Sequence, residues 1–102
     1  MVVIKKPISF QWDKGNIGKN KKHKVEEKEA EEVFFDKKKR TFKDRVHSEN
    51  EERFRLIGKS KKKRLLFIVF TVRREKVRII SARDTNRKEV SLYEEKINTT
   101  KV

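Results

Sequence analysis

Arginines set into an otherwise apolar segment are the first feature of this sequence that could do chemistry. Arg78 and Arg83 bracket the stretch IISA, which has the character of a buried strand, and Arg64 directly precedes the apolar run 65–72. A guanidinium group binds a phosphate through two parallel hydrogen bonds, and a strand would hold that group rigidly. The three arginines are therefore candidate phosphate ligands. The alternative for each is an ion pair, such as Arg78 with Glu89, or projection from a solvated sheet face.

The spacing of two of these arginines limits how they could cooperate. Arg78 and Arg83 are five residues apart, so along a regular strand they would point to opposite faces of the sheet. Both can reach one site only if the strand is twisted or bulged near Ser81. We do not expect Arg64 to act together with both of them.

Groups that could give or take a proton are scattered along the chain. Glu52 directly precedes an expected strand, and His23 lies in a lysine-rich segment and is of a residue type that titrates near neutral pH. The alternatives are a solvated acid among many lysines for Glu52 and a solvated helix end for His23. Tyr93 fits a core or interface position better than a catalytic one. Weaker candidates are Glu51 and His47.

Composition points to one domain with a polyanionic partner. The chain has 102 residues, of which 45% are charged and 33% hydrophobic, and 30 Lys and Arg against 16 Asp and Glu give a formal charge of +14. Such an excess favours nucleic acid, an anionic membrane surface or an acidic protein as partner. There is no cysteine and the two histidines are far apart, so we expect no metal site and no cofactor. Without a signal peptide or a long apolar run, we expect a soluble, cytoplasmic protein.

Periodicity predicts an α+β fold with helices packed on an antiparallel sheet. The capping pair Asn86 and Glu89 opens a C-terminal helix with an apolar stripe at Val90, Tyr93 and Ile97. The run 65–72 is apolar at both parities, so we expect it inside the sheet and covered on both faces. One ordered core spans 8–97, followed by a frayed tail, 98–102. Expected strands are 8–12, 53–58, 65–72 and 76–83, with a short strand or turn at 40–44. Expected helices before the sheet are 16–23 and 25–35.

An ordered set of motifs resembles a known family. FQWDKGNIGKNKKHKV, EKEAEEVFFD, EERFRLIG, RLLFIVFT and VRIISARDTNRKEVSLYE follow one another between residues 10 and 95, and in that order they resemble the BrnT toxins of bacterial type II toxin–antitoxin systems. The resemblance implies a RelE-like fold, a ribonuclease that inhibits translation, and a cognate antitoxin with a ribbon-helix-helix DNA-binding part. The chain departs from the family where Lys24 replaces a glycine and where Arg73-Arg74-Glu75 replaces a glycine-containing hairpin.

The resemblance implies a metal-independent cleavage in which the RNA's own 2′-hydroxyl attacks the adjacent phosphate. That reaction needs cations for the phosphorane, a general base and a general acid. Arg64, Arg78 and Arg83 are the expected cations, and Glu52 and His23 the expected proton carriers. Two alternatives stay open: a non-catalytic RNA-binding or ribosome-associated module, and a degenerate toxin that only binds its antitoxin. A membrane-surface role fits least, because no expected helix combines a broad apolar face with a basic one.

Overall fold

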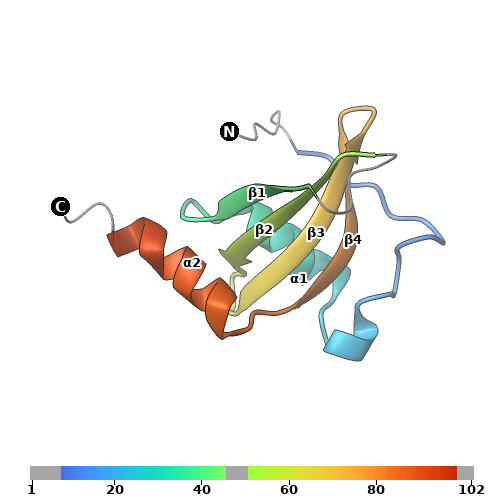
Figure 1. The fold of residues 1–102 in the computed structure, drawn as a ribbon. Helices are drawn as coiled ribbons and strands as arrows, with labels where there is room; N and C mark the ends of the chain where they lie inside the picture. The colour runs from blue at the N-terminus through green and yellow to red at the C-terminus, as the bar shows by residue number, and fades with distance from the viewer. Residues whose placement is uncertain (1–7, 46–50, 99–102) are drawn as a thin grey trace.

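The computed structural model describes residues 8–45 and 51–98, with side chains as far as residue 95. A four-stranded sheet carries one helical layer behind it and a second helix at one end (Figure 1), which confirms the α+β class. No helix in the described part of the chain is long and apolar enough to cross a membrane. The elements in chain order are η1 (Lys21–His23), α1 (Glu27–Glu32), η2 (Val33–Phe35), β1 (Arg40–Asp44), β2 (Arg53–Lys59), β3 (Leu65–Arg73), β4 (Lys76–Asp84) and α2 (Arg87–Asn98).

All four strands are antiparallel and follow one another in chain order, β1-β2-β3-β4. The three expected strands after residue 50 are confirmed, with ends that differ by at most one residue, and the expected strand or turn at 40–44 is a strand. β3 lies inside the sheet as predicted, but the expectation that both its faces are covered is wrong. Leu66, Ile68 and Phe70 are fully buried, whereas Phe67 and Val69, which point the other way, are only half-buried.

The core lies between the sheet and α1 with η2. Phe34 of η2 packs edge-to-face on Phe70 of β3 and on Phe10, with ring centroids 5.0 and 5.3 Å apart. Such aromatic contacts add to the stabilisation from buried apolar area. Trp12 packs against the same cluster and donates from Nε1 to Glu31 Oε2 at 2.7 Å, which anchors it beneath the helical layer.

The N-terminal segment differs most from the prediction. The expected strand 8–12 is reduced to one parallel bridge, Phe10 with Val77, and only the last three residues of the expected helix 16–23 are helical. Two buried asparagines explain the difference, because their side chains bond the edge of β4. Asn16 Nδ2 donates to Ile79 O at 3.0 Å, and Asn20 Oδ1 accepts from Ala82 N at 2.9 Å. The exposed edge of the sheet is thereby closed without a fifth strand.

The helices follow their local signals. The expected helix 25–35 is α1 continued by the 3-10 turn η2. The capping box of α2 is confirmed: Asn86 Oδ1 accepts from Glu89 N, and Glu89 Oε1 accepts from Asn86 N, both at 2.9 Å. Tyr93 is buried as the stripe predicted, whereas the side chain of Ile97 and the tail 99–102 lie outside the described residues.

Both departures from the family pattern coincide with left-handed backbone. Lys24 has φ +57°, and Arg74 and Glu75 have φ +50° and +67°. A side chain at positive φ costs free energy that glycine does not. The glycines expected at these places by resemblance would therefore suit the observed backbone better than the residues present.

Candidate functional site

A bulge in β4 brings the strand-borne arginines to one face. Ile79 pairs with Phe70 and Ser81 with Val69, so Ile80 is an extra residue opposite the Val69–Phe70 step. The extra residue inverts the alternation of side chains beyond it. Arg78 and Arg83 consequently share the face turned away from α1, which we call the outer face. The expected condition for the two arginines to share a face, a twist or bulge near Ser81, is confirmed.

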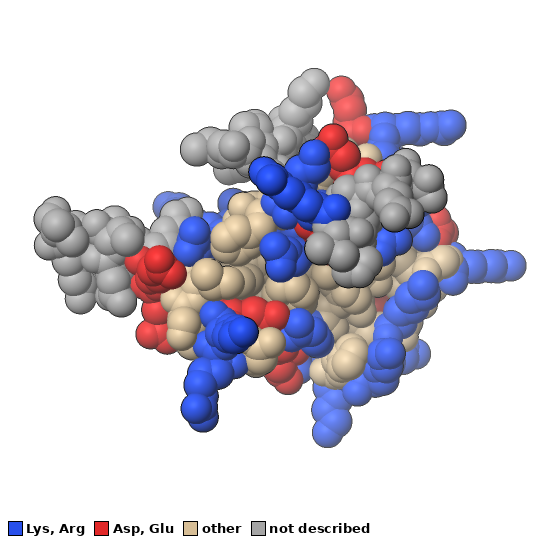
Figure 2. All heavy atoms as spheres, viewed as in Figure 1, with Lys and Arg blue, Asp and Glu red and all other residues tan. Residues whose placement is uncertain are grey.

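The register places twelve side chains on the outer face in three rows across the sheet. α2 crosses only one end of this face, and the middle is uncovered by any described element (Figure 1). In the same orientation, the surface of the molecule shows Lys and Arg side chains with uncharged residues between them (Figure 2). The rows, from β1 to β4, are Arg40, Ile57, Phe67 and Arg83; then Phe42, Arg55, Val69 and Ser81; then Asp44, Arg53, Thr71 and Arg78.

A hollow of about 460 Å³ lies in the outer face, next to the start of α2. Its size falls in the range of small-molecule sites. Apolar side chains from β3 and β4 contribute to its lining, and charged side chains come from β1, β2, β4 and α2. The lining residues are Asp44, Arg53, Arg55, Phe67, Val69, Ile80, Ser81, Arg83 and Glu89.

Arg83 is the most firmly oriented cation of the hollow. Its two Nη atoms donate to the two carboxylate oxygens of Glu89 at 2.9 and 2.8 Å, and Nη1 also donates to Asp84 O at 2.9 Å. The bond to Glu89 raises the pKa of Arg83 and keeps it charged. The guanidinium carbon lies 4.3 Å from the centre of the Phe67 ring. Three of five N–H donors are thus used, and two remain for a ligand.

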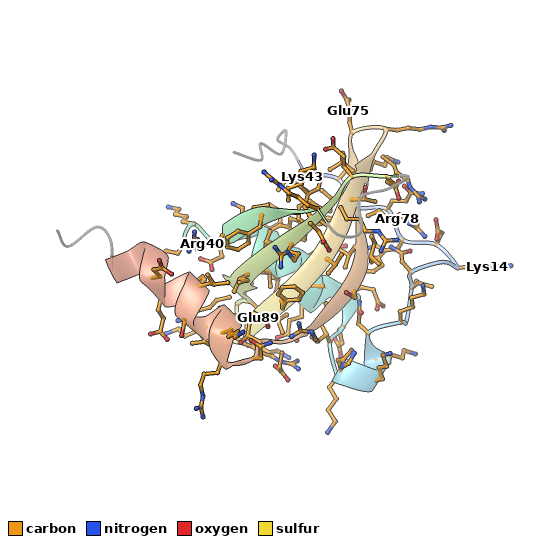
Figure 3. All side chains as sticks on the ribbon, in the orientation of Figure 1. Lys14, Arg40, Lys43, Glu75, Arg78 and Glu89 are labelled. Atoms are coloured by element: carbon orange, nitrogen blue, oxygen red, sulfur yellow. The ribbon has the colours of Figure 1, made fainter. Side chains whose placement is uncertain are left out.

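Arg78 occupies the opposite end of the outer face from Glu89, as the labelled side chains in Figure 3 show. Its side chain is only 11% exposed and donates from Nη1 to Asp13 Oδ2 at 2.6 Å. That bond is the main reason why the pKa of Asp13 is lowered. A methyl group on Gly15 would lie 2.5 Å from Arg78 Nη2, so a larger residue there would make this guanidinium shift. Arg78 therefore ties the N-terminal segment to β4. The alternative of an ion pair with an acid is confirmed, with Asp13 in place of the suggested Glu89.

Arg64 does not reach the outer face. It extends to the opposite side of the sheet, where it holds the segment before α1 against the ends of β3 and β4. Its five N–H donors are all used: Nε and Nη2 on Asp84 at 2.8 and 3.1 Å, Nη1 on Glu29 Oε1 at 3.1 Å and Lys24 O at 2.8 Å, and Nη2 on His23 O at 3.0 Å. Because a guanidinium has five donors, none is left for a phosphate.

The expected proton carriers lie away from the hollow. Glu52 is exposed beside Lys43 Nζ at 3.7 Å, and its carbonyl accepts from Thr71 Oγ1 at 2.6 Å. Arg83 pairs with Phe67 on β3, and Thr71 lies four residues further along that strand. At 3.3 Å per residue, the two positions on β3 are about 13 Å apart. His23 is exposed at the end of η1.

The weaker candidates are bonded elsewhere or lie outside the described residues. Glu51 pairs with Arg73, and Tyr93 donates to Asp36 Oδ2 at 2.8 Å in a buried contact that raises the tyrosine's pKa through desolvation. His47 lies outside the described residues.

Sequence reasoning missed the other residues of the hollow. Arg53 and Arg55 alternate with the apolar Phe54 and Leu56, which shows that they share a face but not which strand faces them. Glu89 was assigned to the helix cap and offered as a partner of Arg78, whereas the arginine that it holds is Arg83. Phe67 and Val69 of β3 were missed because both faces of this strand were expected to be covered by other parts of the protein.

Among the described residues, no group of three or more His, Asp or Glu side chains could hold a metal ion.

Comparison with known proteins agrees with the resemblance. A family model described as the ribonuclease toxin BrnT of type II toxin–antitoxin systems matches residues 12–89. A search of curated proteins finds no match. The match includes every strand of the sheet and the cap of α2. The chain therefore belongs to the BrnT family and is a ribonuclease toxin, with RNA as its substrate and a cognate antitoxin as its partner.

Proposed function

We propose that this ribonuclease binds and cleaves RNA at the hollow of the outer face, by a metal-independent reaction. The observation that carries the proposal is the β4 bulge, which sets Arg83 on the same face as Arg55 and Arg53. Three guanidinium groups line one hollow of about 460 Å³ there. Guanidinium groups on adjacent strands form a preorganised site for a phosphate and for the extra negative charge of its transition state.

Arg83 and Arg55 are the proposed phosphate ligands. Arg83 keeps two donors for the phosphate while Glu89 fixes its orientation. Arg55 is exposed, and its guanidinium carbon lies 5.8 Å from the centre of the Phe42 ring. In the reaction, the 2′-hydroxyl oxygen forms a bond to phosphorus, the 5′-oxygen leaves, and a 2′,3′-cyclic phosphate results. The guanidinium groups neutralise the charge that grows on the non-bridging oxygens.

Carboxylates in the hollow are placed to accept the 2′-hydroxyl proton. Asp44 and Glu89 both line it, and both side chains are largely buried. Glu89 also has a positioning role through Arg83, whereas Asp44 comes from β1 on the opposite wall. We leave Glu52, His23 and Arg64 outside the reaction, because the first two lie away from the hollow and the third has no donor left. Arg78 supports the face by its bond to Asp13.

The proposal extends to the fold relationship and the partner. The order of elements and the antiparallel sheet support a RelE-like fold. The uncovered arginines of the outer face support an acidic segment of the antitoxin as the cover of this site, with a ribbon-helix-helix part elsewhere in that antitoxin. Translation would be the cellular target, in the cytoplasm, with mRNA cut alone or on the ribosome.

The test is RNA cleavage by the purified chain in excess chelator, with and without ribosomes. We expect chelator-resistant cleavage, and a loss of about 100-fold or more in Arg83→Ala and in Arg55→Ala, since removal of one donor to a transition state costs that much. The matched control is Arg74→Asn at the tip of the β3–β4 turn, which removes the same charge and should stay within about twofold. Full activity in a folded Arg83→Ala protein would overturn the site, and inhibition by chelator would overturn metal independence.

A further inference from the structure

We infer that the hollow also holds a nucleobase of the RNA, stacked on Phe67, so that the enzyme recognises a nucleotide rather than a phosphate alone. This inference rests on the proposed cleavage site. It concerns the apolar part of the hollow, which the phosphate chemistry leaves unused.

The apolar lining needs an explanation of its own. Phe67 and Val69 on β3 and Ile80 at the bulge are half-buried and line the hollow. A phosphate site needs donors and gains nothing from three apolar side chains, whereas a base has two flat apolar faces that a ring can cover. The hollow therefore combines cationic groups for the backbone with an apolar surface suited to a base.

Phe67 is positioned to stack a base next to a bound phosphate. Arg83 lies 4.3 Å from its ring centre and is itself fixed by two hydrogen bonds to Glu89. The ring and the proposed phosphate ligand are thus held together as one rigid unit. A nucleotide whose phosphate binds Arg83 would bring its own base, only a ribose away, over the apolar lining.

The rest of the lining can distinguish the edges of a base. Ser81 offers a hydroxyl that donates and accepts, and Arg53 a guanidinium that donates. These groups come from two different strands around one hollow. Such a set can favour one base over another through its polar edge, while Phe67 contributes the stacking that all bases share.

A second ring on the same face provides a matched control. Phe42 on β1 is half-buried like Phe67 and is also close to guanidinium groups, with Arg40 at 4.9 Å and Arg55 at 5.8 Å from its centre. It does not line the hollow. The substitutions Phe67→Leu and Phe42→Leu therefore remove the same ring from the same face, and only one of them should affect a bound base.

The experiment measures binding of a nucleoside 3′-monophosphate and of ribose 5-phosphate to the whole chain by titration calorimetry or NMR. All four nucleotides are compared. We expect at least one of them to bind about 5- to 150-fold more tightly than ribose phosphate, which is the range for stacking one base. Phe67→Leu should abolish this difference and keep ribose phosphate binding. Phe42→Leu should keep the difference, and thermal unfolding of both variants shows that they are folded.

The outcomes separate the inference from the proposed function. Equal binding of nucleotides and ribose phosphate by the unsubstituted chain would overturn the base site, whether or not Phe67→Leu folds. A preference that survives in Phe67→Leu, or is lost equally in Phe42→Leu, would overturn the role of Phe67. Undiminished RNA cleavage by Arg83→Ala would overturn the cleavage site instead, and ribose phosphate binding reports on the cations separately from either.

Discussion

Replacement of Arg64 by alanine should destabilise the protein rather than disable its chemistry. The side chain is 27% exposed and joins the segment before α1 to the end of β4 through carboxylates and carbonyl groups. Its partner Asp84 is 67% exposed and can be rehydrated, so that half of the network contributes at most about 1 kcal/mol. Glu29 is the costly partner, because only 9% of its side chain is exposed.

The expected magnitude follows from Glu29. Without Arg64, its carboxylate keeps one hydrogen bond, from Ser60 Oγ at 2.9 Å, and remains a largely buried charge. An uncompensated group of this kind costs about 1–3 kcal/mol. With the exposed part of the network, Arg64→Ala should lower the free energy of unfolding by about 1–4 kcal/mol. For a domain of this size, that is a fall in Tm of roughly 5–30 °C.

Urea unfolding followed by Trp12 fluorescence measures this change. Addition of Glu29→Gln to Arg64→Ala removes the buried charge, so the double variant should recover part of the loss. Below its melting temperature, Arg64→Ala should cleave RNA at about the rate of the unsubstituted chain. A stability loss under about 0.5 kcal/mol together with abolished cleavage would refute the reasoning and return Arg64 to the list of phosphate ligands.

Two further predictions concern the backbone and pH. Lys24→Gly should raise the free energy of unfolding by about 0.5–1 kcal/mol, because it relieves a side chain at φ +57° at the cost of a more flexible unfolded chain; a lower urea midpoint would contradict this. Asp36 is subject to desolvation, which alone would raise its pKa, but bonds from Lys59 N, Lys38 N and the Tyr93 hydroxyl lower it overall. A lowered pKa stabilises the fold above the unfolded value of about 4, and this stabilisation is lost as pH falls below it. Asp36→Asn should therefore be less stable than the unsubstituted chain at pH 7, with the gap narrowing towards pH 2–3 in urea titrations; a gap that is constant with pH would contradict it.

The strands and the cap of α2 were predictable because their signals are local. Alternation at 53–58, the apolar run at 65–72, and Asn86 with Glu89 each depend on residues within one element. The N-terminal strand was not predictable in the same way. Its alternation is real, and Phe10 does pack on the core, but Asn16 and Asn20 take the hydrogen bonds of β4 that a longer strand would have used.

The candidate site depended on relations that a single sequence does not contain. Arg64 and Arg83 are the same residue type at the ends of neighbouring strands, yet one points to the helical side and the other to the outer face. The alternation of side chains along a strand assigns Arg83 to the outer face only once the bulge at Ile80 is known. Arg55 enters the site through its register with Val69 and Phe42, and pairing register is set between strands rather than within one.

The bulge also explains why cations stand in an apolar strand. β4 must bury Val77, Ile79 and Ala82 against the core. If this sequence alternated regularly, Ala82 would point outward with Arg78, and Arg83 would point into the core. Ile80 takes up the mismatch, so the strand keeps all three core contacts and still presents both arginines outward. Removal of Ile80 would leave a regular strand in which Ile79 and Ala82 still point inward and Arg78 and Arg83 still point outward. With Ile80 present, the bulge is therefore what keeps Ala82 in the core and Arg83 on the outer face at the same time.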